Sequence, residues 1–306
     1  GLGPKWKWLG VIFSVFGALA AFGIGNISQI NSIASSVNSV AVAFHENAKE
    51  FDTIIGLITG VVIAIFVALV LLGGVKRIGQ VTEKLVPGMA AIYIVCALVV
   101  VIANAGTIPG VFASIFHNAF NFQAIFGGFV GSALMQGIKR GLYSNEAGVG
   151  SAPNAAAAAS VSHPVKQGLV QMLSVFIDTL LICSATAFML LCSGVEPTAE
   201  LEGAPYVQAA LSASFGQIGP IFITVAMVLF AFTTLIGNLY YVDNAWNYIF
   251  KRVPPKSFML GFRIVAMLVV LIGATRSISL VWNLADVLMG LMAILNLPVI
   301  VILSRP

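Results

Sequence analysis

Long apolar runs separated by short polar connections dominate this chain and predict membrane-spanning helices. A bilayer span needs about 20 mostly apolar residues, and about eight runs meet that length. We predict spans over Trp8 to Ala43, Ile54 to Leu72, Pro87 to Ala105, Phe129 to Ser162, Gly168 to Ser193, Pro220 to Tyr241 or beyond, Phe258 to Ala274 and Ile278 to Leu303. The uncharged segment Gly106 to Gly128 is expected to be interfacial or re-entrant, and Ala204 to Phe215 a short surface helix.

One polar stretch, Lys139 to Pro153, interrupts the fourth of these spans. Its glycines at 141, 148 and 150 and its proline weaken a helix locally and free backbone groups. In a membrane such groups are tolerated only when they are buried in protein or line a wet cavity. Broken helices of this kind build the midplane sites of many secondary transporters. The pattern alone leaves two interpretations open, a mid-membrane site or a polar loop at the membrane surface.

The composition agrees with an all-α integral membrane protein. The chain is 59% hydrophobic and 8% charged, whereas soluble domains carry about 25% charged residues. Most basic residues lie in short connections, so the net charge of +4 does not point to nucleic acid. The cysteines at 96, 183 and 192 lie in apolar runs and are expected to be small core residues. No catalytic or metal-binding pattern is recognisable, so we predict neither an enzyme nor an organic cofactor, and no obligate protein partner.

The charges of the connections predict how the chain crosses the membrane. Basic connections alternate with acidic or uncharged ones, with Arg276 as the exception. The basic residues are Lys5, Lys7, Lys76, Arg77, Lys84, Lys166, Lys251, Arg252, Lys256 and Arg305. Because cytoplasmic loops are enriched in Lys and Arg, both ends of the chain are expected in the cytoplasm. The fourth span then starts outside and reaches Lys139 and Arg140 about halfway through the bilayer, at 1.5 Å per residue. This favours the mid-membrane site, with Glu146 as the partner of both cations.

Two further polar features have alternative interpretations. Gly25, Gln29, Ser32 and Ser36 share a helical face on the first span, which predicts either interhelical hydrogen bonds or a cavity wall. Asp178, near the middle of the fifth span, is either a proton or ion relay or a structural acid.

The stretch Lys139 to Pro153 closely resembles the signature of the alanine or glycine:cation symporter family, the sodium/alanine symporters. The resemblance extends over the whole chain. It includes the segments Gly23 to Ser32, His163 to Gly168, Phe176 to Thr179, Phe230 to Thr234 and Trp282 to Asp286.

This resemblance implies a leucine-transporter-like fold of two five-helix inverted repeats. The chain would supply core helices three to ten, with residues 1–126 as a partial first repeat and 127–306 as the second. The first two core helices would be missing, in line with the absent starting Met. The implied function is sodium-coupled symport of a small neutral amino acid (alanine or glycine) by alternating access. The partners would be that substrate, Na⁺ and the bilayer of a bacterial or archaeal cell membrane. The alternatives are a proton-coupled or broader-specificity transporter of the same fold, or an ion channel.

The resemblance also implies site residues. Substrate binding falls on Gln29, Ser144, Asn145 and Thr234, and sodium binding on Thr233 and Thr234. Asn238 stands where the family usually has Trp, which would enlarge and polarise the pocket. The broken-helix and charge network comprises Lys139, Arg140, Glu146, Gly148 and Asp178. The family usually has Pro before Asn where this chain has Leu295 and Asn296, and no function is attached to that difference. The repeated Gly25-Asn26 and Gly237-Asn238 pairs are a faint echo of an internal repeat.

Overall fold

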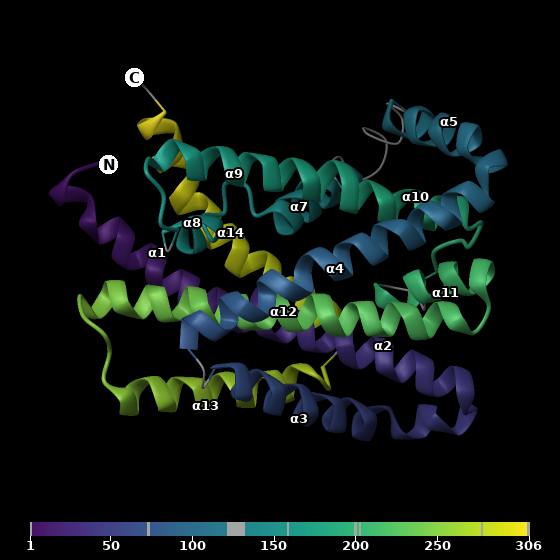
Figure 1. The fold of residues 1–306 in the computed structure, drawn as a ribbon, viewed down its shortest axis with the longest axis horizontal. Coiled ribbons are helices and arrows are strands. Elements are labelled where there is room, and N and C mark those ends of the chain that lie inside the picture. Colours follow the sequence, from purple (N-terminus) through teal and green to yellow (C-terminus); the bar gives the residue numbers. More distant parts are fainter. Residues whose placement is uncertain are drawn as a thin grey trace. The chain divides into compact units, whose positions relative to one another are not determined.

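The computed structural model describes residues 2–71, 74–120, 132–157, 159–198, 201, 203–276 and 278–304. All regular structure in these ranges is helical (Figure 1). The α-helices are α1 (Lys7–Ala20), α2 (Ser28–Phe44), α3 (Asp52–Leu71), α4 (Gly74–Ala103), α5 (Ile108–Ala119), α7 (Ser132–Asn145), α8 (Ala152–Ala156), α9 (Pro164–Phe176), α10 (Ser184–Cys192), α11 (Ala204–Phe215), α12 (Ile218–Phe250), α13 (Lys256–Gly273) and α14 (Ile278–Leu303). Two π-helical segments, η2 (Ala21–Ile27) and η5 (Ile177–Cys183), join α1 to α2 and α9 to α10.

Seven helical runs in the described ranges are long and apolar enough to cross a membrane. They are Pro4–Phe44, Asn47–Leu71, Ile78–Ala103, Pro164–Cys192, Ile218–Phe250, Lys256–Gly273 and Ser279–Leu303. They correspond to seven of the predicted spans. The remaining one contains two short helices, α7 and α8, separated at residues 146–151. Its predicted start, Phe129, and the end of the predicted re-entrant segment lie outside the described residues, while α5 covers part of that segment.

The prediction of a loop around Lys76, Arg77 and Lys84 is wrong, because these residues belong to helix α4. The expected start of the third span, Pro87, lies inside the same helix. Lys, Arg, Gln and Glu are good helix formers, so a charged segment outside the apolar core still continues the helix.

The chain forms two compact units, which are described separately. Unit 1 comprises Gly1–Met89, Gly148–Ala158 and Ile221–Pro306. Unit 2 comprises Ala90–Ala147 and Ala159–Pro220. The polar stretch of the sequence is therefore divided between the units. The predicted repeats of residues 1–126 and 127–306 meet outside the described residues and stay a prediction.

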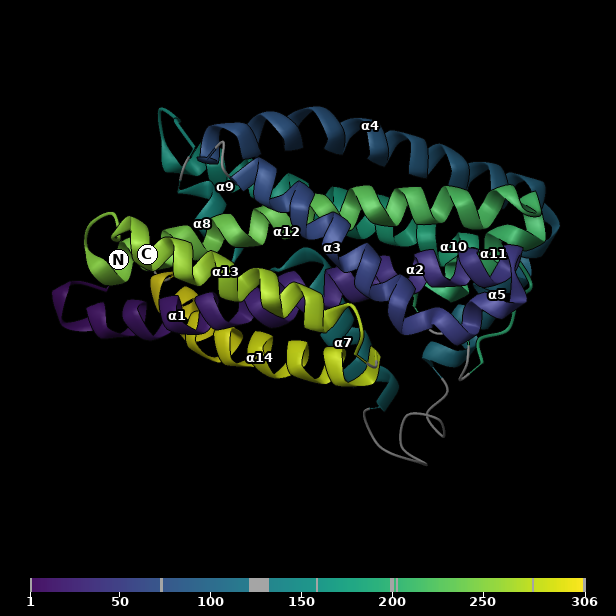
Figure 2. The same cartoon turned by 90° about the horizontal axis from the view of Figure 1, so that it is seen from below.

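Unit 1 is built around a continuous helical run, α1–η2–α2, that lies against α12, α13 and α14 (Figures 1 and 2). Its main core joins α2, α3, α12 and α13 through fully buried Ile30, Ile33, Val67, Leu235 and Val270. Two small residues of this run, at positions 17 and 21, contact different neighbouring helices. Gly17 faces Met292 of α14, whereas Ala21 clusters with Val242 and Ala245 of α12.

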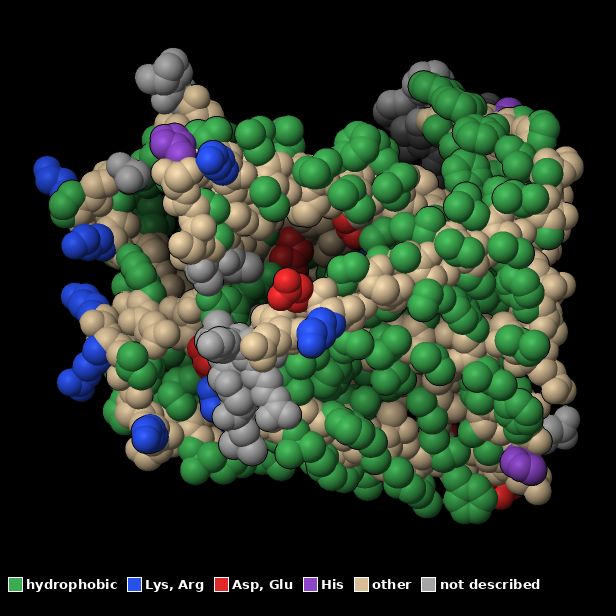
Figure 3. All heavy atoms as spheres, viewed as in Figure 1, with side chains coloured by type: hydrophobic (Ala, Val, Ile, Leu, Met, Phe, Trp, Pro, Cys, Tyr) green, Lys and Arg blue, Asp and Glu red, His purple; other side chains and the backbone are tan. Residues whose placement is uncertain are grey.

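Several basic residues of unit 1 gather at one end, whereas Lys49, after α2, and Arg276, after α13, belong to other connections. Lys5 and Lys7 at the start of the chain, Lys251 and Arg252 after α12, and Lys256 at the start of α13 lie at the end that also holds both termini (Figures 1 and 2). Figure 3 shows Lys and Arg side chains concentrated there. The positive-inside rule associates such a basic end with the cytoplasm, and the orientation of the chain stays a prediction.

Unit 2 holds the later part of α4 with α5, α7, α9–η5–α10 and α11. The Tyr93 hydroxyl on α4 lies 2.8 Å from the Thr186 hydroxyl on α10. Phe112 of α5 packs against Phe188 of α10, with ring centroids 5.1 Å apart. These contacts join α4 and α5 to α10.

An ion pair connects α12 to α13 inside unit 1. Arg263 donates to Asp243 at 3.1 Å, and both side chains are mostly buried. Removing one partner of a buried pair is destabilising, while neutralising both costs less. We expect Asp243→Asn to lower the free energy of unfolding by about 1–3 kcal/mol, and the double variant Asp243→Asn, Arg263→Gln to recover part of that loss. Thermal denaturation of the complete protein in detergent measures both, and a double variant less stable than either single one would contradict the pairing.

Candidate functional site

The close contact between Gly25 and Asn238 places two of the polar segments side by side. A Cβ atom added to Gly25 of η2 would lie 2.5 Å from the Asn238 Cβ and 2.6 Å from its Cγ on α12. Only glycine permits this approach. The Asn238 side chain is 9% exposed, and its amide nitrogen donates to the Thr234 carbonyl oxygen at 3.0 Å.

The same contact sets the register of the two antiparallel helical runs. Ala18 and Ala21 of the first run cluster with Val242 and Ala245 of α12, whereas Gly25 contacts Asn238. Higher residue numbers on the first run thus lie opposite lower ones on α12, so the two runs are antiparallel. Gln29 lies about one helical turn beyond Gly25, and Thr234 lies one turn before Asn238. Gln29 and Thr234 therefore lie at matching levels. We call Gly25, Gln29, Thr234 and Asn238 the α2–α12 seam.

The seam lies near the middle of two membrane-length helices and contains no charged residue. Thr234 is the central residue of α12 (Ile218–Phe250), and Gln29 is close to the middle of the run Pro4–Phe44. Uncharged amide and hydroxyl groups at this depth can form hydrogen bonds with the ammonium and carboxylate of a zwitterion.

The two predicted sodium ligands, Thr233 and Thr234, use their hydroxyl protons in hydrogen bonds, which leaves lone pairs of the hydroxyl oxygens available. The Thr233 hydroxyl lies 3.1 Å from the Leu229 carbonyl oxygen and 2.9 Å from that of Phe230. Thr234 donates to the Phe230 carbonyl oxygen at 3.0 Å. Each proton is thus used within α12, while the oxygen can still face a hard cation, which prefers oxygen ligands. The two side chains differ in exposure, since Thr233 is buried and Thr234 is exposed.

Two other polar positions of the first helical run, Asn31 and Ser36, form hydrogen bonds with other helices. The Asn31 amide donates to the carbonyl oxygens of Gly273 at 3.1 Å and Arg276 at 2.7 Å, which satisfies the C-terminal end of α13. The Thr224 hydroxyl donates to the Ser36 carbonyl oxygen at 3.2 Å. Asn31 thus forms hydrogen bonds between helices, and both interpretations of the face formed by Gly25, Gln29, Ser32 and Ser36 stay predictions. Asn26 is fully buried, and neither its amide nitrogen nor its oxygen has a hydrogen-bond partner among the described residues.

A second polar group lies wholly within unit 2, where the end of α7 meets the π-helical segment η5. The Ser144 hydroxyl donates to an Asp178 carboxylate oxygen at 2.7 Å and lies 3.1 Å from the Cys183 sulfur. The Asn145 amide nitrogen lies 3.4 Å from the Thr179 hydroxyl. We call Ser144, Asn145, Asp178, Thr179 and Cys183 the Asp178 cluster. Sequence reasoning missed Thr179 and Cys183, because hydroxyl and thiol groups in apolar runs usually serve packing.

Helix α7 ends at the predicted break. Glu146 adopts a left-handed conformation, with φ of 52°, and its N–H donates to the Leu142 carbonyl oxygen at 3.0 Å. The Asn145 side-chain oxygen accepts from the Ala147 N–H at 2.9 Å. These contacts terminate the helix and turn the chain. Lys139 and Arg140 are half-buried on α7, and their pairing with Glu146 remains a prediction.

Beyond the break, the chain joins unit 1. The Asn296 amide on α14 donates to the Gly148 carbonyl oxygen at 2.9 Å, and the Asn244 amide on α12 donates to the Asn154 carbonyl oxygen at 3.1 Å. The position to which the sequence attached no function thus contacts the broken stretch directly.

The structure therefore gathers the predicted residues in two groups. Unit 1 brings together Gln29, Thr233, Thr234 and Asn238, and unit 2 brings together Ser144, Asn145 and Asp178. A π-helical segment lies beside each group, since Gly25 of η2 contacts Asn238 and Asp178 belongs to η5. This helical form is rare and is frequent at functional sites. The repeated Gly-Asn pairs do not contact each other reciprocally, because Gly25 meets Asn238 whereas a Cβ on Gly237 would meet nothing within 4 Å.

Comparison with known proteins identifies similar chains. The model of the sodium:alanine symporter family matches residues 1–306. The chain is 42% identical over 305 residues to the amino-acid carrier protein AlsT of Bacillus subtilis, covering 100% of this chain and 62% of that protein. It is 45% identical to the sodium/alanine symporter AgcS of Methanococcus maripaludis, covering 97% of this chain and 63% of that protein. It is 43% identical to the probable sodium/glutamine symporter GlnT of Bacillus subtilis, covering 98% of this chain and 60% of that protein.

Similarity to these relatives does not identify which amino acid is bound. The chain spans 60–63% of the length of these relatives. Two relatives of nearly equal identity are named for different amino acids, alanine and glutamine. Overall identity therefore does not select the substrate, and local contacts carry that argument.

Proposed function

Because the chain belongs to the sodium:alanine symporter family, we propose that the complete protein is a secondary transporter that couples sodium entry to uptake of a small neutral amino acid. Alanine and glycine are the proposed substrates, and alternating access is the proposed mechanism. The proposal includes a leucine-transporter-like arrangement, in which this chain supplies core helices three to ten. It also includes a location in a bacterial or archaeal cell membrane, with the basic end of unit 1 in the cytoplasm.

The observation that carries this proposal is the α2–α12 seam. Polar groups in the middle of membrane-length helices are costly unless they find partners. Gln29 and Thr234 present an amide and a hydroxyl at matching levels, with no fixed charge that would select an ionic side chain. A small zwitterion fits this chemistry because its ammonium and carboxylate can both be hydrogen-bonded there.

The broken stretch supports the same proposal from unit 2. Ser144 and Asn145 lie in the last turn of α7, where the chain leaves the helix. Backbone groups released by such a break favour the charged ends of a substrate or ion. We assign Ser144 and Asn145 to the substrate, and Thr233 with Thr234 to sodium. Asp178 holds the break to η5 through Ser144 and is the group on which proton coupling, the alternative, would depend.

The polarity of Asn238 extends the proposed substrate range. Asn238 has an amide where the family usually has the bulky indole of Trp. The seam therefore keeps a group that can form hydrogen bonds, and no aromatic ring closes it. Small neutral amino acids are expected to bind, with amide-bearing side chains as competitors. The relative named for glutamine motivates the choice of glutamine as that competitor.

Transport in proteoliposomes containing the complete protein tests the function. We expect labelled alanine to accumulate when a sodium gradient is imposed, and not when potassium replaces sodium. Thr234→Val should weaken sodium activation about tenfold, since one oxygen ligand is lost, whereas Thr234→Ser keeps the hydroxyl and should remain close to wild type.

Other outcomes separate the alternatives. Accumulation driven by a pH gradient without sodium would support proton coupling instead. Flux without accumulation or counterflow would support a channel, and both results contradict the sodium symport proposed here.

A further inference from the structure

The segment that follows the break, residues 148–157, is held to unit 1 by side chains outside its own helix. The chain passes from unit 2 to unit 1 between Ala147 and Gly148 and returns to unit 2 after Ala158. Helix α8 within the segment has only five residues, too few to be stable by itself. Its position therefore depends on contacts with the neighbouring helices.

The first contact is made by α14. The Asn296 amide donates to the Gly148 carbonyl oxygen at 2.9 Å. Gly148 and Gly150 both have positive φ, of 86° and 100°, a conformation that favours glycine. A Cβ on Gly148 would lie 2.7 Å from a Leu297 methyl carbon, and one on Gly150 would lie 2.7 Å from the Phe13 ring and 2.9 Å from the Asn296 Cγ. The backbone of the break thus lies directly on α14 and α1.

The second contact is made by α12. The Asn244 amide donates to the Asn154 carbonyl oxygen at 3.1 Å. Asn154 and Asn244 also line a groove of ≈ 590 Å³ between α1, α8 and α12, together with Ser14, Tyr240 and Tyr248. Water in this groove can compete for the same groups, so this bond is open to exchange.

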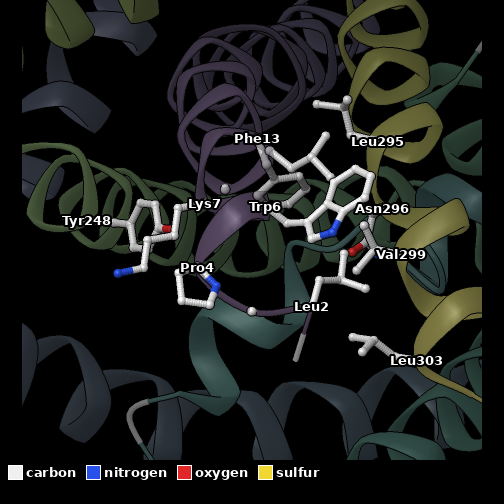
Figure 4. Close-up of a pocket in the computed structure, with 13 residues that line it drawn as sticks. Leu2, Pro4, Trp6, Lys7, Phe13, Tyr248, Leu295, Asn296, Val299 and Leu303 are labelled. Carbon is white, nitrogen blue, oxygen red and sulfur yellow. The ribbon is translucent and has the colours of Figure 1, made fainter.

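Asn296 borders a second groove, which shares Gly10, Phe13 and Tyr248 with the first. This groove has a volume of ≈ 580 Å³ and lies between the first residues of the chain, Tyr248 and the last turns of α14 (Figure 4). Trp6, Phe13, Asn296 and Val299 line it. The Asn296 side chain therefore lies between a groove and the backbone of the break, rather than in the interior of a packed core.

We propose that Asn296 and Asn244 are positioning residues that form a two-point latch on the broken stretch. The latch fixes residues 148–157 on α1, α12 and α14, and so fixes the backbone groups at the break. Each point is a single side-chain hydrogen bond to a carbonyl oxygen, so its loss is expected to shift an equilibrium by about three- to tenfold. The effect on substrate affinity rests on the proposed function, whereas the latch itself does not.

Thiol labelling tests the latch without any transport measurement. Val149 lies between the two glycines and is 3% exposed, so the introduced thiol of Val149→Cys should react slowly with a small maleimide. Adding Asn296→Ala or Asn296→Asp removes the donor and should speed this labelling about tenfold. Modification at position 149 is quantified by mass spectrometry. Asn283→Ala, an exposed asparagine on the same helix, is the control and should leave the rate unchanged.

Asn244→Ala provides an independent test at the other point. It should speed labelling by a smaller factor, because its bond lies farther from Val149. It also keeps the proposal testable if Asn296 variants fail to fold. Equal labelling rates in the wild-type background and in every Asn296 and Asn244 variant that folds would overturn the latch.

Alanine uptake by the complete protein then tests the positioning role. We expect Asn296→Ala to raise the half-saturating alanine concentration about three- to tenfold at a similar amount of folded protein. Faster labelling with unchanged half-saturation would overturn the positioning role while leaving the latch. Absence of uptake by the wild-type protein, with the labelling result as expected, would contradict the proposed function and not the latch.

Discussion

Gly25→Ala is expected to destabilise unit 1 by overpacking the contact between η2 and α12. The added methyl group would lie 2.5 Å from the Asn238 Cβ, a distance at which the neighbouring helix must move. The Cβ atom of Asn238 is fixed to its backbone, so rotation of the side chain cannot relieve the contact. We expect a loss of about 1–3 kcal/mol from overpacking, measured as a lower thermal midpoint in detergent.

Two other glycines in the same pair of helical runs serve as controls. A Cβ on Gly17 would meet Met292 at 3.9 Å, an ordinary contact, and one on Gly237 would meet nothing within 4 Å. Gly17→Ala and Gly237→Ala should therefore retain wild-type stability or gain slightly, because alanine favours helix.

A compensating substitution makes the first prediction sharper. Asn238→Gly removes the two atoms closest to the added methyl group, so the double variant Gly25→Ala, Asn238→Gly should be more stable than Gly25→Ala alone. A single Gly25→Ala variant as stable as wild type would show that η2 and α12 are not in the described contact.

The hydrophobic pattern was sufficient to predict most of the long helices. The predicted limits of the last span match α14, and those of the predicted short helix Ala204 to Phe215 match α11, because apolar length and flanking polar residues determine both. It failed at the start of α4, where charge suggested a loop but helix-forming side chains continue the helix. Leucine-transporter-like topology and the inverted repeat remain predictions.

The two π-helical segments could not be predicted from the local sequence pattern, and neither could the contacts that they form. A change from α to π geometry shifts the helical face by a fraction of a turn, and no residue type marks it. The Gly25–Asn238 contact and the Asp178–Cys183 proximity both involve such a segment, so neither was predictable from helical spacing. Asn296 was recognisable only as an unusual position, because its partner is a backbone carbonyl distant in sequence.

The interruption at Gly148 and Gly150 was predictable because its cause is local. Glycine tolerates positive φ, and both residues adopt it. The residues flanking the interruption were also recognisable, since amide and hydroxyl groups at a helix end usually satisfy freed backbone groups. The division of this stretch between two compact units was not predictable, because it depends on contacts with α1, α12 and α14.

Asn145→Ala is expected to abolish measurable substrate binding by the complete protein. The Asn145 side chain has two identified contacts, with the Ala147 N–H at 2.9 Å and the Thr179 hydroxyl at 3.4 Å. Alanine removes the acceptor that shapes the end of α7 and the amide proposed to contact the substrate. Loss of a hydrogen bond to a charged group lowers affinity about ten- to hundredfold, and loss of the helix-end contact adds to this. Substrate-induced thermal stabilisation measures the affinity without requiring transport.

Thr179→Val tests whether Asn145 acts only through its contact with η5. Valine removes the hydroxyl that Asn145 contacts but leaves Asn145 and its bond to Ala147 in place. If Asn145 acts only by holding α7 to η5, the two variants should lose affinity equally. We expect Thr179→Val to lose only a few-fold, because a contact of 3.4 Å is long for a hydrogen bond. Equal losses would assign Asn145 to the structure of the break, and unchanged affinity in Asn145→Ala would remove it from the site.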